Sequence, residues 1–287
     1  MKIQVLFVLL LCGSLCAPAQ KKLLLGGSGW NKIVLLDKKS KQVEWSHRLN
    51  PGDECNCVAY TKKGQILYAY RKGARLITKD GQTVWDYPVA GEGELHTASV
   101  LPDGGYLLGI TGKPARIVEL DKKGKVRKEI TYDTRINSLH GQFRQLRKSR
   151  EGTYLVPLMS RHMVVELDAD GKLLQSYNAE GNTFSVLELK NGNLLVSCGD
   201  AHSFLEVDRK TGDLLRKVKQ NDIDGVALQF VAEIAAVKDH LLVCNWAGHS
   251  RVKDQPSLIE LDADGKVVWS LCDSENIRNV SAVCPVK

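Results

Sequence analysis

The chain lacks long hydrophobic runs, with one exception near its start, Ile3 to Cys12. A membrane-spanning helix needs roughly 20 apolar residues, so this run is too short to be one. Lys2 precedes the run and Ala17-Pro18-Ala19 follows it, which is typical of an export signal with its cleavage site. We therefore predict a signal peptide over residues 1–19 and an exported protein, periplasmic or extracellular, without a membrane span.

A lipoprotein anchor on Cys16 is the alternative to simple cleavage. Acylated cysteines of that kind usually follow a small residue, whereas this chain has Leu15 before Cys16. We therefore favour cleavage after Ala19. Because no polar linker long enough to separate two domains follows, we expect residues 20–287 to form one domain.

The sequence also lacks the cysteine spacing of a metal site. Cys55 and Cys57 have no second pair of ligands at the spacing that zinc sites use. Six cysteines lie beyond the signal, namely Cys55, Cys57, Cys198, Cys244, Cys272 and Cys284. An even number suits disulfides in an oxidising compartment, but six cysteines permit 15 pairings, so the pairing stays open. We predict no bound metal.

Long helical periodicity is missing as well, and short β-rich runs separated by turns take its place. One hairpin pattern recurs six times, for example "LIELDADGKVVWSL" from Leu258. The six turns of these hairpins begin at Asp37, Thr78, Asp121, Asp168, Asp208 and Asp262. The intervals between them run from 40 to 54 residues, a period typical of four-stranded propeller blades.

A second pair of strands precedes most of these hairpins, as in "FSVLELKNGNLLVS" from Phe184, so each repeat supplies four strands. Residues 22–49 supply only three strands, and 279–286 supply one with nothing after it. We predict an all-β, six-bladed β-propeller closed by a composite blade, because closure hides the sheet edges. An open β-solenoid does not explain the split repeat. The predicted blades cover 53–89, 92–131, 138–178, 181–219 and 227–271, with 22–49 and 277–287 forming the composite one.

Positive charge is in modest excess, with a formal net charge of +7. The lysines stand in pairs beside turns, such as Lys38-Lys39 and Lys122-Lys123. Such pairs are more typical of a solvated surface than of a nucleic-acid interface. We predict a monomer that does not bind nucleic acid.

One face of the predicted propeller concentrates the residues that carry chemistry. The tight hairpin turns lie on the opposite face, whereas the other connections hold five of the seven histidines. The candidate ligand-binding residues are Asn56, His96, His140, Gln142, Arg161, His162, Asn182, His202, Asn245, Trp246, His249, Arg251 and Asn279. Neutral donors and acceptors around the channel mouth suit a small polar ligand. Alternatively, they satisfy the ends of the inner strands and ordered channel water.

The most distinctive connection is "CNWAGHSRV", from Cys244 to Val252. Trp246 offers a stacking face, and His249 and Arg251 offer positive charge or proton transfer. The tryptophan can equally serve packing between blades.

The "LDADGKVVW" hairpins and the Asn-Trp-x-Gly-His stretch from Asn245 to His249 resemble the PQQ-binding-like (quinoprotein-type) propeller superfamily, especially exported bacterial propellers of unassigned function. The resemblance implies the fold but not an activity, because one fold can carry many functions. Quinoproteins of this kind are longer, are usually eight-bladed and carry adjacent cysteines, which this chain lacks. We therefore expect neither PQQ nor calcium and predict no cofactor.

Three functions remain open. The first is a binding or scaffold propeller that recognises a small polar molecule, a glycan or a partner protein on the histidine-rich face. The second is an enzyme, since the chain also resembles arylsulfotransferase-type propellers. His96, His140, Arg144 and His249 are then the candidate catalytic residues for group transfer or a lyase reaction. The third, a quinoprotein oxidoreductase, fits the sequence least.

Overall fold

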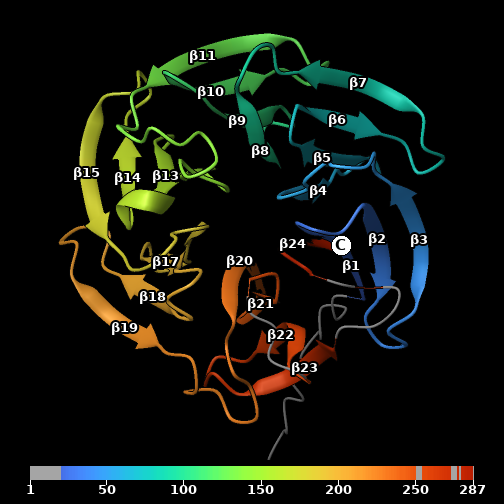
Figure 1. The fold of residues 1–287 in the computed structure, drawn as a ribbon, viewed down its shortest axis with the longest axis vertical. Helices are drawn as coiled ribbons and strands as arrows, with labels where there is room; N and C mark the ends of the chain where they lie inside the picture. The colour runs from blue at the N-terminus through green and yellow to red at the C-terminus, as the bar shows by residue number, and fades with distance from the viewer. Residues whose placement is uncertain (1–20, 250–253, 273–276, 278, 287) are drawn as a thin grey trace, which may run out of the picture.

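The computed structural model describes residues 21–249, 254–272, 277 and 279–286. They form 24 strands in six four-stranded antiparallel sheets, which stand as blades around a central axis (Figure 1). The described residues include one short 3-10 helix, η1 (Met159–Arg161). The predicted six-bladed β-propeller is confirmed.

The composite blade joins the two ends of the described chain. Its strand order is β24-β1-β2-β3, made of β24 (Ala282–Val286), β1 (Lys22–Gly26), β2 (Lys32–Asp37) and β3 (Val43–Arg48). Leu24 of β1 pairs with Cys284 of β24, so the C-terminal strand is the innermost one. This closure is the one that the split repeat predicts.

The other five blades are contiguous in sequence, with strand order running from the axis outward (Figure 1). The first contains β4 (Val58–Tyr60), β5 (Ile66–Tyr70), β6 (Gly73–Ile77) and β7 (Thr83–Pro88). The second contains β8 (Glu94–Val100), β9 (Tyr106–Thr111), β10 (Ala115–Leu120) and β11 (Val126–Tyr132). The third contains β12 (Arg147–Lys148), β13 (Tyr154–Leu158), β14 (Met163–Leu167) and β15 (Leu173–Asn178). The fourth contains β16 (Val186–Glu188), β17 (Leu194–Ser197), β18 (Phe204–Val207) and β19 (Leu214–Val218). The fifth contains β20 (Phe230–Val237), β21 (His240–Trp246), β22 (Pro256–Leu261) and β23 (Val267–Cys272).

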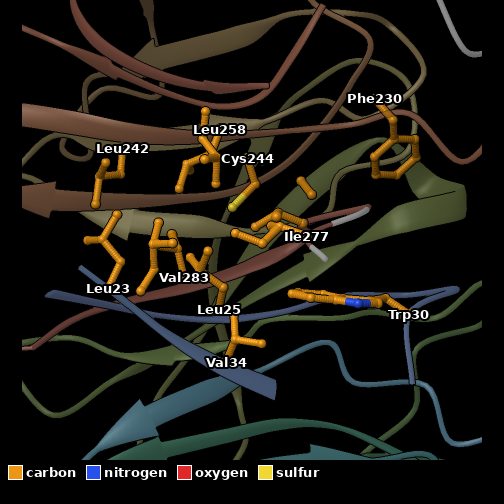
Figure 2. Close-up of a cluster of buried hydrophobic side chains, with 14 of the residues drawn as sticks. Leu23, Leu25, Trp30, Val34, Phe230, Leu242, Cys244, Leu258, Ile277 and Val283 are labelled. Carbon is orange, nitrogen blue, oxygen red and sulfur yellow. The ribbon is translucent and has the colours of Figure 1, made fainter. Parts of the chain in front are cut away.

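The hydrophobic core is divided into layers between neighbouring blades. Strand side chains alternate between the two faces of a sheet, so Leu23 and Leu25 face the fifth blade while Leu24 faces the first. Figure 2 shows the first of these layers, where Leu23 and Leu25 meet Leu242 and Cys244. Burial of each such leucine stabilises the fold by about 1.5–3 kcal/mol. The described residues contain six such clusters, one for each interface between blades.

Polar contacts join the blades near their outer strands. The indole nitrogens of Trp45 and Trp269 donate to the carbonyls of Lys79 and Lys38, which lie in hairpin turns of the next blade. These tryptophans therefore pack between blades.

The two ends of the central channel differ in their connections. Within each blade, one tight turn joins the first strand from the axis to the second, and another joins the third to the fourth; we call the end of the channel with these turns the hairpin face. We call the opposite end, with the longer connections, the connection face. No helix in the described part of the chain is long and apolar enough to cross a membrane. The six cysteines of the described residues are all free, and four of them are buried.

Candidate functional site

The inner strand of the second blade contains a bulge near the connection face. Leu95 pairs with Ile110 and Thr97 pairs with Gly109, which leaves His96 as the extra residue. Bulges re-aim a side chain and are common beside functional sites. His96 is fully buried, and its Nε2 lies 3.0 Å from Oε2 of Glu94, two residues earlier on the same strand. The sequence therefore places an imidazole against a buried carboxylate.

Two neighbouring blades complete this group of side chains. His140 lies in the long connection that precedes β12, and its Nδ1 is 3.1 Å from the same Glu94 Oε2. Asn56 precedes β4, and its Nδ2 is 3.2 Å from Nδ1 of His96. Arg144 places Nη2 2.7 Å from Nε2 of His140. We call Asn56, Glu94, His96, His140 and Arg144 the mouth cluster.

The partners fix where the protons lie. A guanidinium only donates, so Nε2 of His140 accepts from Arg144 and its Nδ1–H donates to Glu94. The amide nitrogen of Asn56 also only donates, so Nδ1 of His96 accepts and its Nε2–H donates to Glu94. Both imidazoles are therefore neutral, and the carboxylate of Glu94 receives both donors.

The electrostatics agree with this assignment. Burial and the nearby Arg144 guanidinium lower the pKa of His96 to about 4. Hydrogen bonds from His96, Arg71 and His140 hold the pKa of Glu94 far below its usual range, although burial opposes the shift. At neutral pH the histidine is uncharged and the carboxylate is ionised, an arrangement that suits hydrogen bonding and proton transfer.

Two further charged residues flank the mouth cluster. Nη2 of Arg71 lies 2.5 Å from Oε1 of Glu94, and Oε2 of Glu54 lies 4.0 Å from Nδ1 of His140. Burial raises the pKa of Glu54, but Arg144 and His96 outweigh it and lower the pKa overall. Two carboxylates thus face two guanidiniums, and the formal charges balance.

The side chains exposed to solvent are a small part of this site. His140 has 56% of its side chain exposed and Arg71 has 52%, whereas Glu94 has 6% and His96 none. A cavity of about 450 Å³ is lined by Gly93 and Leu139, the chain neighbours of Glu94 and His140, and by residues such as Arg116, rather than by the mouth cluster itself. An approaching ligand therefore meets an imidazole and a guanidinium, with the carboxylate behind them.

Below the mouth cluster, polar side chains fill the channel. Nε2 of Gln145 donates to the carbonyl of Asn56 at 2.6 Å and to Glu233 at 3.0 Å. Arg147 binds the other oxygen of Glu233 at 2.6 Å. Burial raises the pKa of Glu233 despite the opposing effect of Arg147. This layer joins the third and fifth blades and forms a floor beneath the mouth cluster.

A second group lies on the connection face between the fourth and fifth blades. His249 Nδ1 is 3.0 Å from Oδ1 of Asp200, and Asn182 donates to Oδ2 of Asp200 at 2.5 Å. The rings of Trp246 and Phe230 meet His249 edge to face at 4.8 and 5.4 Å. The described histidines of the connection face therefore do not form one ring.

Other predicted site residues bind the backbone. The fully buried Asn245 accepts from the amide of Gln229 and donates to the carbonyls of Ala227 and Pro256. Gln142 likewise spans both backbone groups of Gly112. Their hydrogen-bonding groups hold connections together, so a ligand-binding role for them stays a prediction.

The remaining predicted positions are separate from the mouth cluster. His162 and His202 both adopt positive φ and place Nδ1 against the carbonyls of Gly181 and Gln229. Asn279 is half-buried with a φ of 48°, and its carbonyl oxygen lies against Gly27, where a Cβ atom would clash. Arg161 ends η1. Arg251 lies outside the described residues.

Sequence reasoning missed Glu54 and Glu94 and gave Arg71 no role. "ELH", from Glu94 to His96, contained the useful signal, because residues two apart on a strand share a face. Acidic residues near strand ends are common, however, so Glu94 does not stand out in the sequence. The bulge that orients His96 has no sequence pattern that would predict it. The cluster became visible only when the connections were placed in space.

Comparison with known proteins places the chain in a family. The sequence matches the Mal s 1 allergenic protein-like family over residues 26–266. The chain belongs to that family. A search of curated proteins finds no match to the chain. The match supports a six-bladed propeller but does not confirm the PQQ-binding-like assignment.

Solved structures share the fold of this chain. A Bacteroides caccae protein of unknown function, solved by crystallography, is 42% identical with a TM-score of 0.90, and the match covers 93% of this chain and 98% of that one. A streptogramin B lyase is 14% identical with a TM-score of 0.61 and coverages of 91% and 86%. A catalytically inactive histidine-to-alanine variant of Staphylococcus aureus virginiamycin B lyase with quinupristin is 11% identical, with a TM-score of 0.58 and coverages of 90% and 87%. At such low identity the two lyases share the fold alone.

Proposed function

We propose that this Mal s 1-like propeller is a binding protein that holds a small polar ligand at the mouth of its channel. The supporting observation is the mouth cluster, in which Glu94 and His96 are buried and paired. Burying polar groups costs free energy unless each has a partner. Here Glu94 and His96 are partners of each other, and the pair lies behind Arg71 and His140, which remain open to solvent as polar groups of a binding site do.

The exposed groups indicate the chemistry of the ligand. Arg71 presents N–H donors to solvent, while the carboxylate that compensates it lies behind. Both ring nitrogens of the exposed His140 are already engaged by Glu94 and Arg144. Arg144 is 3% exposed and donates to a ring nitrogen of His140, a weaker acceptor than an anion. A carboxylate or phosphate on the ligand would offer these donors a better partner. We therefore propose an acidic sugar or a similar small polar acid.

Thermal unfolding with defined probes tests this function. D-glucuronate and glycerol 3-phosphate are expected to raise Tm in a saturable way, whereas glucose, which has no acidic group, is not. His140→Ala is expected to lower the affinity at least about 10-fold, because it removes the exposed ring that holds the Arg144 guanidinium in place. His240→Ala is the matched control, since His240 also contacts a buried glutamate, Glu260, but lies on the hairpin face. Equal shifts with glucose, or none with either acid, would contradict the proposal.

A second candidate is a lyase. The pairing of an exposed imidazole with a buried carboxylate is the arrangement of a general base and the group that orients it. The Nε2 lone pair of His140 becomes free once Arg144 turns to an oxygen atom of the substrate. Quinupristin is the direct probe, because a distant structural neighbour is a lyase with that compound.

Liquid chromatography tests the second candidate. A lyase is expected to convert quinupristin, and His140→Ala is expected to abolish conversion while His240→Ala retains it. Unchanged quinupristin after prolonged incubation with a folded protein counts against this activity. It leaves the binding function to be judged by the Tm shifts.

A further inference from the structure

We propose that Glu94, His96 and His140 hold a divalent transition-metal ion. This inference goes beyond the proposed function and runs against the sequence-based prediction of no metal. One ligand atom from each residue lies within 4.8 Å of the others. No spacing motif announces them, because His140 comes from a different blade and lies 46 positions from Glu94.

The distances suit coordination without a large rearrangement. In zinc-like sites, metal–nitrogen and metal–oxygen distances are about 2.0–2.2 Å. Neighbouring ligand atoms then lie about 3.3–3.6 Å apart at tetrahedral angles and about 2.8–3.1 Å apart at right angles. Oε2 of Glu94 lies 3.0 Å from Nε2 of His96 and 3.1 Å from Nδ1 of His140. An ion can therefore replace the two N–H bridges. No proton leaves, because in each ring the proton moves to the other nitrogen.

The surroundings of His96 provide a second, independent observation. A metal-bound imidazole usually donates its other N–H to an oxygen. With the ion on Nε2, Nδ1 of His96 needs such an acceptor, and the side chain facing it is the fully buried Asn56. Oδ1 of Asn56 is buried without a hydrogen-bond partner among the described residues. A half-turn of the amide brings this orphaned oxygen against Nδ1–H.

Metal binding also affects the flanking charges. Glu54 stands close to the ligand group, with Oε2 4.0 Å from Nδ1 of His140. Glu54 can turn towards the ion as a fourth ligand. Binding has a cost, because the proton on Nε2 of His140 displaces the 2.7 Å contact from Arg144. Arg144 still donates through Nη1 to the carbonyls of His140 and Phe143.

The ligand set selects the class of metal. Two imidazole nitrogens and one carboxylate oxygen, with positions left open, suit first-row divalent ions such as Zn²⁺, Co²⁺ or Ni²⁺, whereas Mg²⁺ and Ca²⁺ prefer oxygen ligands. The added charge would leave the mouth cluster positive and attract an anionic molecule. The metal thus strengthens the site for acids without being required for it.

Titration of the metal-free protein with Co²⁺ alone, followed by visible absorption and calorimetry, tests the inference. One Co²⁺ per chain is expected to bind with nitrogen and oxygen ligation, and Zn²⁺ is expected to displace it. Glu94→Gln and His140→Ala should each weaken binding at least about 10-fold, while His240→Ala should not. His140 is largely exposed, so its variant is expected to fold, and circular dichroism checks this.

Three results would overturn the metal site. The first is that Co²⁺ does not bind saturably. The second is that Glu94→Gln and His140→Ala bind Co²⁺ as tightly as the wild type does. The third is a thiolate charge-transfer band, which would assign the ion to cysteine. The titration contains no organic ligand, and the glucuronate measurement is made with EDTA. Failure of the metal site and failure of the proposed binding function therefore give different outcomes.

Discussion

At the residue scale, the structure separates asparagines and histidines that look alike in the sequence. Asn56 and Asn245 are both fully buried, but Asn245 uses its amide on three backbone groups whereas Asn56 leaves its oxygen without a partner among the described residues. His202 binds a carbonyl while His96 binds a carboxylate. Residue type and strand position predicted which face these side chains occupy. They did not predict the partners, because those come from other blades.

Asn245→Ala tests the structural role of its amide. The substitution leaves the buried N–H of Gln229 and the carbonyls of Ala227 and Pro256 without this partner. We expect a loss of about 2–4 kcal/mol in the free energy of unfolding, measured by urea denaturation, because an unsatisfied buried group costs about 1–3 kcal/mol. Asn182→Ala, which removes a bond to the more exposed Asp200, should lose less than about 1 kcal/mol. Equal losses would show that burial is not the cause.

At the element scale, repetition explains both the success and the gaps of sequence reasoning. The hairpin spacing predicted the last residue of each contiguous blade to within one position, since the turns follow simple Asp and Gly chemistry. The inner strands begin two to nine residues later than predicted, because the connections that lead into them have no such turn pattern. The composite inner strand begins at Ala282 rather than Asn279, because Asn279 takes up a positive φ. The repeats also place a glutamate on the third strand of several blades, including Glu119, Glu166 and Glu260. These glutamates join blades through partners that lie outside their own hairpins, so the hairpin pattern alone does not predict this role.

Glu166→Gln tests that role. Burial would raise the pKa of Glu166, but hydrogen bonds from Arg209, Thr153 and Tyr177 lower it overall. A carboxylate with a lowered folded-state pKa stabilises the fold above its unfolded value, near 4.5, and loses this effect as pH falls through the folded value. We expect the variant to lose about 2 kcal/mol at pH 7.

The pH profile of unfolding checks this explanation. The difference between wild type and Glu166→Gln should shrink below pH 4.5, where the wild-type carboxylate becomes protonated. Glu151→Gln is the matched control, because Glu151 contacts the same Arg209 at 3.1 Å but is 74% exposed. It should change stability by less than about 0.5 kcal/mol. A difference for Glu166→Gln that persists undiminished at pH 2 would rule out the charge as its cause.

At the scale of the whole molecule, ring closure and the site depend on each other. Asn56, Glu94 and Arg144 come from three consecutive blades, so their distances are set by the angles between blades. The floor below them extends this dependence to the ends of the chain, because the backbone N–H of Val283 donates to Glu233 at 2.8 Å. Sequence reasoning predicted the ring and the face of the site. It could not predict the cluster, whose geometry is a property of the closed ring.

Deletion of residues 277–287 tests this dependence. It removes β24, which exposes the edge of β1, and it removes the buried Ile277, Val280 and Val283 from the core of Figure 2. At about 2 kcal/mol for each side chain, this loss is about 6 kcal/mol, comparable with the whole stability of many domains. We expect a product that aggregates in size-exclusion chromatography and lacks a cooperative thermal transition.

The control for this deletion is removal of Lys287 alone, which keeps β24 and should leave Tm unchanged. A further variant, Val283→Ala, keeps the strand and its edge pairing but opens a small cavity, which should cost about 1–3 kcal/mol. If closure by β24 matters more than the volume of its side chains, the deletion aggregates while Val283→Ala remains monomeric with a lower Tm. A deletion product that stays monomeric and melts like the full chain would show that the ring does not need its composite blade. Ring closure would then not explain the distances between blades that bring the mouth cluster together.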